Sequence, residues 1–238
     1  VFLELLGQSA ERVDPLMRLA QAHLDAADCP PDRGSSSAWS GRGWKAGLSP
    51  HAPYTVHPDL LTRVCRLSRE RNAPVAMHLA ESWDELELLR SHCGPLVELL
   101  RELGAWDPTI LPRGLRPRDY LEQLAAASRA LVVHGNFLDV GDWAFLADRR
   151  DQMSVVYCPR THAFFLSTPY PLAEMLARGV RVVLGTDSRA TNPDLDFLAE
   201  LRWVARHPPA VAPADILKMA TCDSAAALGC ADLGRLTP

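Results

Sequence analysis

The sequence predicts an α/β fold in which short strands alternate with longer helices around a parallel sheet. Short apolar runs recur along the chain, and longer amphipathic segments separate them, which is typical of repeated βα units. The 238 residues are 47% hydrophobic and 23% charged, enough apolar material for one sizeable core and too little charge for a disordered chain. We therefore expect a single domain over residues 1–238.

Six apolar runs are the expected strands. They cover Val1–Leu6, Trp44–Leu48, Pro74–His78, Ala130–His134, Ser154–Cys158 and Val180–Leu184. An open, doubly wound sheet fits the same alternation. However, no GxGxxG or P-loop motif follows the first strand, so nothing in the sequence supports a nucleotide-binding fold.

The segments between these runs carry apolar residues at helical spacing. Pro58–Asn72 is the clearest helix, with arginines on its polar face and His57 placed to cap its start. Similar patterns cover Asp84–Leu103, Pro117–Ala127, Asp142–Ala147, Pro171–Arg178 and Asp194–Ala205. The stretch Asp28–Gly43, rich in Pro, Ser and Gly, is expected to be a flexible surface loop.

Net charge and cysteine spacing indicate which kind of partner and which cellular compartment to expect. The formal net charge is -4, so no global field draws the chain to nucleic acid or to an anionic membrane, and a small-molecule substrate is expected. The six cysteines show no CxxC spacing, which favours reduced thiols and a cytoplasmic location. No apolar run approaches the roughly 20 residues that a membrane helix needs.

Residues suited to metal binding or proton transfer follow four of the expected strands. Ser49-Pro50-His51 follows the second, His78 and Glu81 the third, His134-Gly135 the fourth, and Gly185-Thr186-Asp187 the last. In a barrel these carboxyl ends converge at one mouth. A single histidine at a strand end is more often structural than a ligand, so the argument rests on four such ends in order.

Five segments resemble, in order, the signatures of the amidohydrolase superfamily. They are Leu48–Tyr54, His78–Ser82, Val133–Gly135, Tyr157–Thr161 and Leu184–Ser188. The branch they resemble holds aminofutalosine, adenosylhomocysteine and guanine deaminases together with triazine chlorohydrolases. The resemblance implies a partial TIM (β/α)8 barrel of about six βα units, without the first barrel strands, their HxH pair of metal ligands and the small β-sandwich of the family.

The resemblance also implies a metal site with one divalent ion, Zn²⁺ or Fe²⁺. His78 corresponds to a metal ligand, and Asp187 corresponds to a ligand that also takes a proton from the attacking water. Glu81 corresponds to the proton shuttle, and His134 to the histidine that hydrogen-bonds the water or the tetrahedral oxygen. The alternative interpretations are that Glu81 opens the following helix and that His134 is a structural core histidine.

Four further residues are expected to contact the substrate. His51 and Tyr54 match a substrate-contacting position of the branch, whereas His162 and Ser188 stand where its members usually carry Asn and Gly. These two departures indicate that substrate contacts differ from those of the named deaminases. Lys45 lies near the start of its strand, not at the end where binuclear relatives carry a bridging lysine, which favours a single metal.

The expected function is that of a metal-dependent hydrolase that deaminates an aminated heterocycle such as a purine base or nucleoside. Chlorohydrolase or amide hydrolase activity at the same site is the alternative within the enzyme class, and a non-catalytic truncated barrel is the alternative outside it. Because the HxH pair is absent, the chain by itself is expected to bind metal poorly and to be inactive. Relatives are often dimers, so a homodimer is also expected.

Overall fold

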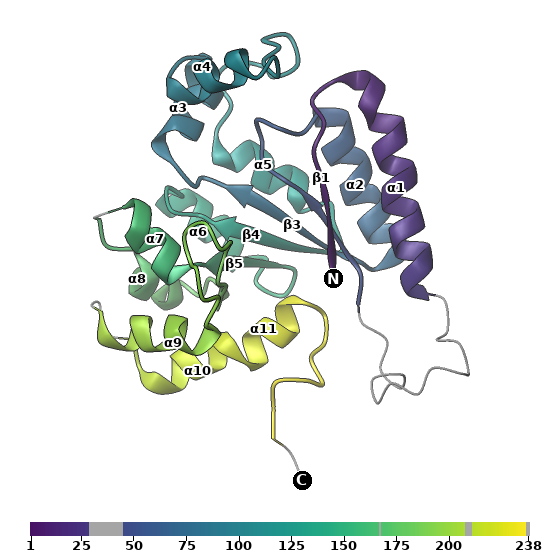
Figure 1. Ribbon diagram of the computed structural model, residues 1–238. Helices are drawn as coiled ribbons and strands as arrows, with labels where there is room; N and C mark the ends of the chain where they lie inside the picture. The colour runs from purple at the N-terminus through teal and green to yellow at the C-terminus, as the bar shows by residue number, and fades with distance from the viewer. Residues whose placement is uncertain (29–44, 167, 208–210, 237–238) are drawn as a thin grey trace. The chain divides into compact units, whose positions relative to one another are not determined.

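The computed structural model describes residues 1–28, 45–166, 168–207 and 211–236 (Figure 1). It confirms the predicted fold class, because its strands pair in parallel and helices follow them along the chain. The chain divides into two compact units. Unit 1 comprises Val1–Met77 with Glu87–Arg129, and unit 2 comprises His78–Leu86 with Ala130–Pro238. The single domain over residues 1–238 stays a prediction.

Unit 1 contains the first strands and the helices that cover them. Strand β1 pairs with β2 from Phe2↔Gly47 to Leu5↔Pro50, and β2 pairs with β3 at Leu48↔Val75. Helices α1 and α2 lie side by side against these strands (Figure 1). The elements are β1 (Phe2–Leu5), α1 (Ala10–Asp28), β2 (Gly47–Pro50), α2 (Pro58–Arg71), most of β3 (Pro74–Leu79), the end of α3 (Trp83–Ser91), α4 (Pro95–Glu102) and α5 (Pro117–Leu124).

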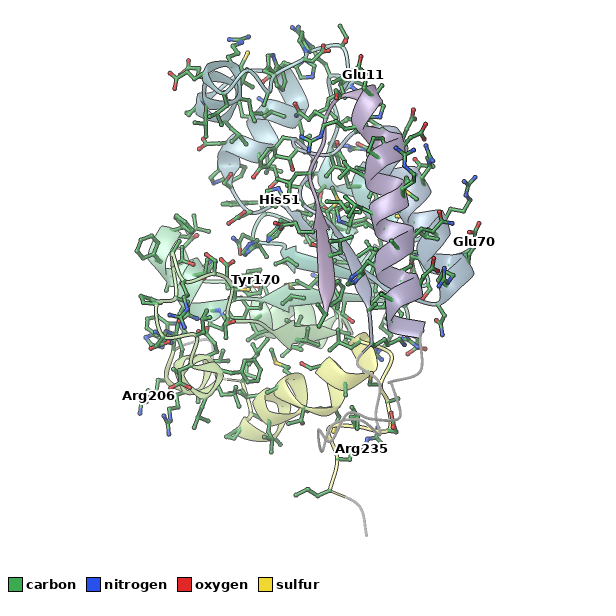
Figure 2. All side chains as sticks on the ribbon, turned by 45° about the vertical axis from the view of Figure 1, so that its right-hand side comes forward. Glu11, His51, Glu70, Tyr170, Arg206 and Arg235 are labelled. Atoms are coloured by element: carbon green, nitrogen blue, oxygen red, sulfur yellow. The ribbon has the colours of Figure 1, made fainter. Side chains whose placement is uncertain are left out.

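The α2 helix confirms the expectation drawn from its periodicity. Its apolar stripe is buried, and the ring of His57 accepts the Asp59 N–H at its start, as predicted. On its polar face Arg63 pairs with Asp14 of α1 at 2.6 Å, while Glu70 stays exposed (Figure 2). The arginines of α2 therefore serve helix packing and solvation.

Unit 2 contains the last three strands with the helices between them. Strand β4 pairs with β5, and β5 with β6, while the Gly135 N–H donates to the Leu79 carbonyl at the end of β3. Helices α10 and α11 pack on β6. The elements are β4 (Arg129–His134), α6 (Val140–Ala147), β5 (Met153–Tyr157), α7 (Pro159–Phe165), α8 (Leu172–Ala177), β6 (Val182–Leu184), α9 (Phe197–Arg206), α10 (Pro213–Ala220) and α11 (Cys222–Ala227).

Two predicted elements end where local backbone chemistry stops them. The expected helix Asp84–Leu103 is two helices, because Gly94 has φ 96° and the ring of Pro95 disfavours a helical residue before it. The last strand begins at Val182, not Val180, because the Val180 N–H still bonds the Met175 carbonyl at the end of α8.

Other expectations shift or fall outside the described part of the chain. The second strand lies at Gly47–Pro50, so Ser49 and Pro50 belong to it and only His51 follows it. Asp28 is the last residue of α1, and the rest of the expected loop Asp28–Gly43 lies outside the described residues. Four helices were not among the predicted elements: α1, α7, α10 and α11. No helix within the described ranges combines the length and apolar character needed to cross a membrane.

Candidate metal centre

The end of β3 presents His78 and Glu81 on either side of a sharp turn. Between them, Ala80 has φ 54°, a left-handed conformation that residues with a Cβ seldom adopt. The turn is held by Glu85 of α3, whose carboxylate oxygens accept the N–H groups of Ala80 and Glu81, both at 2.9 Å. The Ser82 hydroxyl accepts the Glu85 N–H, so Ser82 opens α3 and Glu81 stays outside the helix.

The end of β4 turns just as sharply at His134. Its φ is 69°, and Gly135 follows with φ 60°. A Cβ on Gly135 would lie 3.0 Å from Leu138 and 3.2 Å from Val155, so the glycine gives both the turn and the close packing. The side chain of His134 is buried, which leaves it out of contact with bulk solvent.

The β6 end carries Asp187 on a third left-handed residue, with φ 58°. A Cβ on Gly185 would approach Val156 to 2.8 Å, so glycine is required for the close passage of β6 beside β5. The Thr191 hydroxyl lies 3.4 Å from Asp187 Oδ2, and the Asn192 amide donates to the Thr186 carbonyl at 2.8 Å. These contacts fold the loop back onto the strand end.

Three of these strand-end residues meet. One ring nitrogen each from His78 and His134 and a carboxylate oxygen of Asp187 all lie within 4.8 Å of one another. The rings of His78 and His134 have centroids 5.4 Å apart, and Glu81 Oε1 lies 3.4 Å from His134 Nε2. The predicted convergence of His78, His134 and Asp187 is therefore found within unit 2.

Burial sets the protonation states of the cluster. It lowers the pKa of His134, and the neighbouring His78 lowers it further against the opposing effect of Asp187, so His134 is neutral at pH 7. Burial raises the pKa of Glu81, which His78 partly offsets. A carboxyl group with a raised pKa beside a neutral imidazole is suited to proton transfer.

His162 and Ser188 occupy different surroundings. His162 is buried and packs edge-on against the rings of Tyr157 and Tyr170, with centroid distances of 5.9 and 5.4 Å. Burial lowers the pKa of His162. Ser188 is exposed, and its hydroxyl accepts the Ala190 N–H at 3.3 Å.

Cys158 is buried at the end of β5. Its burial, with Asp187 nearby, raises the pKa of its thiol. A thiol that stays protonated is a poor nucleophile, in keeping with the packing role expected from the sequence.

His51 and Tyr54 lie in unit 1. The His51 Nδ1 atom is 2.7 Å from the Thr55 hydroxyl, and the rings of His51 and Tyr54 meet edge-on with centroids 6.3 Å apart. Glu4 was not among the predicted site residues, yet its carboxylate lies within 4.8 Å of a His51 ring nitrogen. Glu4 could have been identified from the sequence, because it is an acidic residue in the otherwise apolar run Val1–Leu6.

Three buried polar residues behind the cluster were not predicted either. They are Glu85, Tyr170 and Glu200. Burial raises the pKa of Glu85 to about 7, and it raises the pKa of Glu200 as well. The spacing Ser82-x-x-Glu85 was a readable signal because it matches a helix capping box, although the Glu85 carboxylate bonds Ala80 and Glu81 instead of Ser82.

The donor set of the cluster fits a divalent metal ion. Imidazole nitrogens and carboxylate oxygens are ligands that zinc and iron accept. A buried neutral His134 and a buried Glu81 with a raised pKa beside such a cluster are typical of metal-dependent hydrolases built on barrel strand ends.

The chain belongs to the amidohydrolase family, whose pattern matches residues 35–238. It is 32% identical over 213 residues to a 5-methylthioadenosine/S-adenosylhomocysteine deaminase of Pelotomaculum thermopropionicum, which covers 83% of this chain and 44% of that relative. The chain thus spans less than half the length of this relative.

Solved structures show the same fold. The Helicobacter pylori aminofutalosine deaminase is similar with a TM-score of 0.77 and 24% identity, over 96% of this chain and 55% of that one. An adenosine deaminase from Xanthomonas campestris with bound zinc gives a TM-score of 0.67 and 25% identity, over 98% of this chain and 48% of that one. This likeness supports the predicted partial (β/α)8 barrel.

Proposed function

We propose that the protein is a metal-dependent hydrolase that removes the amino group of an aminated heterocycle, such as a purine base or nucleoside. One observation carries the proposal: His78, His134 and Asp187 bring their ligand atoms within 4.8 Å of one another while Glu81 lies beside His134. The deaminase name of the 32% identical relative supports the choice of reaction.

His78 and Asp187 are the residues that we assign to hold the ion, with one zinc or iron per site. When bound, such an ion supplies Lewis acidity that lowers the pKa of water toward neutrality. The zinc-bound Xanthomonas campestris structure supports this choice of metal. A homodimer and a cytoplasmic location are further parts of the proposal, and they rest on the resemblance and on the scattered cysteines.

Asp187 and Glu81 each carry out a different part of the proton transfer. Asp187 accepts a proton from the attacking water, whose oxygen forms a bond to the ring carbon that bears the amino group. Glu81, whose pKa burial raises, gives a proton to the ring nitrogen. The deprotonated Glu81 then takes the proton of the added hydroxyl group and passes it to the amino group, so the carbon–nitrogen bond breaks and ammonia leaves as the carbonyl forms. The proton held by Asp187 returns to Glu81 and restores the starting state.

The neutral state of His134 matters for the same reaction. Because burial lowers its pKa, its ring carries one N–H at neutral pH, which can donate to the oxygen that becomes negative as water adds. We assign substrate contact to His51, Tyr54, His162 and Ser188. His162 packs edge-on against the rings of Tyr157 and Tyr170, and these contacts fix the position of its ring.

The release of ammonia tests the proposed deaminase activity. The complete gene product, loaded with zinc, is offered adenosine, 5′-methylthioadenosine, S-adenosylhomocysteine and guanine, and ammonia is measured by an enzyme-coupled assay. We expect ammonia from at least one of them, and far less from a Glu81→Gln variant. Chloride release from chlorinated triazines, or carboxylate release from cyclic amides, without ammonia would favour the alternative hydrolase activities. No turnover of any of these would favour a non-catalytic barrel.

A further inference from the structure

Three backbones at the strand ends of unit 2 lie in the left-handed region. They belong to Ala80 after β3, His134 at the end of β4 and Asp187 after β6, with φ of 54°, 69° and 58°. Residues with a Cβ keep such a conformation only where their surroundings hold it, and this strain gathers at functional sites. Each of these turns therefore needs a partner that holds its backbone.

Glu85 holds the first turn. Its two carboxylate oxygens accept two successive amides, those of Ala80 and Glu81, and its side chain is 1% exposed. A carboxylate that binds two adjacent N–H groups fixes the peptide planes on both sides of Ala80. The directions in which His78 and Glu81 leave the backbone are fixed with them.

Tyr170 holds the second turn. Its hydroxyl donates to the His134 carbonyl at 3.0 Å, and its ring is stacked on Tyr157 with centroids 3.9 Å apart and planes 10° from parallel. Tyr157 is the last residue of β5, so the neighbouring strand fixes where the Tyr170 hydroxyl lies. Figure 2 labels Tyr170 in this part of unit 2.

Asn192 holds the third turn. Its amide donates to the Thr186 carbonyl, one residue before Asp187, and also to the carboxylate of Glu200. Glu200 is fully buried and accepts the Arg160 N–H at the start of α7 with its other oxygen. The loop that carries Asp187 is thus tied to the neighbouring strand end.

We propose that Glu85, Tyr170 and Asn192 are positioning residues of the metal centre. Each of them stabilises one left-handed strand end through a hydrogen bond to its backbone. None of the three is a member of the ligand cluster. The inference rests on the function proposed above, because it assigns these residues to the same site. Groups that orient metal ligands typically change metal affinity or activity by about 10–100-fold when they are removed.

Tyr170→Phe is the cleanest test because it removes one hydroxyl and keeps the stacked ring. With zinc saturating, kcat should fall by about 10-fold while KM changes by less than about twofold, because the hydroxyl acts through His134 and not on the substrate. A change in melting temperature alone would indicate a merely structural role.

Glu85→Gln tests the first turn without reference to activity. Glutamine offers one acceptor oxygen, so one of the Ala80 and Glu81 amides loses its partner. Hydrogen exchange followed by mass spectrometry should show faster exchange in the peptide that contains residues 78–82. The matched control is Glu87→Gln, which changes a carboxylate of the same helix outside the turn and should exchange as the wild type does.

The outcomes separate this proposal from the proposed function. Variants that bind zinc, turn over and exchange like the wild type would overturn the positioning role. If the wild type releases no ammonia but Glu85→Gln exchanges faster over residues 78–82 while Glu87→Gln does not, the positioning role holds and the proposed deaminase activity fails. If the wild type releases ammonia and the variants are unchanged, the deaminase activity holds and the positioning role fails.

Discussion

The two compact units differ in how their strands end. In unit 1, β1 leads into Leu6 and β2 leads into His51, and neither residue has a left-handed backbone. Among the described residues of that unit, those with a left-handed backbone that are not glycine are Asn72 and His92, and both lie just after helices. Among the described residues of unit 2, three of the four left-handed residues that are not glycine lie at strand ends: Ala80, His134 and Asp187.

The two units differ in this way because their left-handed residues have different roles. Left-handed residues after helices are ordinary helix stops, whereas the strand-end residues of unit 2 include His134 and Asp187 of the candidate cluster and Ala80, which lies two residues after His78. A sharp turn lets a side chain leave the strand end toward the site while the following loop folds back. The left-handed strand ends of unit 2 thus lie at the proposed metal centre, whereas the left-handed residues described in unit 1 other than glycine follow helices.

The largest effect is expected at the cluster itself. His78→Ala removes one imidazole from the ligand set, so zinc measured by elemental analysis should fall to background and turnover should be lost with it. An Asn72→Gly variant in unit 1 replaces a left-handed helix stop by a residue that favours that conformation, and it should keep its zinc. If the His78→Ala variant keeps the zinc content of the wild type, the assignment of the left-handed strand ends to the metal centre is contradicted.

Glu81→Gln should separate proton transfer from metal binding. We expect zinc content to remain at the wild-type level while kcat falls on the order of 10²-fold or more, because an amide cannot relay a proton. Steady-state kinetics with parallel elemental analysis give both numbers. Loss of zinc in step with activity would recast Glu81 as a ligand.

Leu61→Ala should damage unit 1 and spare the site. Leu61 is a fully buried residue of α2, so its truncation is expected to lower the free energy of unfolding by about 2–5 kcal/mol in urea titrations. The zinc affinity of the folded protein should be unchanged. A parallel loss of zinc affinity would show that the two units do not divide stability and chemistry in this way.

The last expected effect is a pH dependence of stability from Glu85. Its pKa is raised to about 7 by burial, from the ordinary value of 4.5, so its contribution to stability is full below pH 4.5 and is lost as the pH rises through 7. Glu85→Gln stays neutral throughout. Its stability relative to the wild type should therefore rise between these pH values, as read from melts at each pH, and a constant difference would contradict the buried, protonatable state of Glu85.

The residues of the cluster could be predicted from sequence because of two simple regularities. The carboxyl ends of parallel strands lie at one edge of a sheet, and the HxxE spacing keeps Glu81 close in sequence to His78, so that both leave the same strand end. His78, His134 and Asp187 were all found in this way. The same argument predicts that His51 lies at this mouth, and both that position and its substrate contact stay predictions.

What the sequence did not reveal depends on long-range packing. Tyr170 lies 36 residues after His134 in the sequence. No local pattern identifies a loop tyrosine whose hydroxyl will donate to the His134 carbonyl. The helix α1 was a different kind of miss, because Val13, Leu16, Ala20 and Leu24 carry its helical period and all are buried. The break before Pro95 was equally readable from the Gly-Pro pair.

The ligand set of the bound metal is the most direct test of the proposed metal centre. X-ray absorption at the zinc edge of the loaded complete protein measures which atoms surround the ion. We predict nitrogen and oxygen neighbours alone, at about 2.0–2.2 Å, from imidazoles and the Asp187 carboxylate. A sulfur neighbour at about 2.3 Å would place Cys158 or another thiol on the metal and would contradict the assignment of His78 and Asp187 as its ligands.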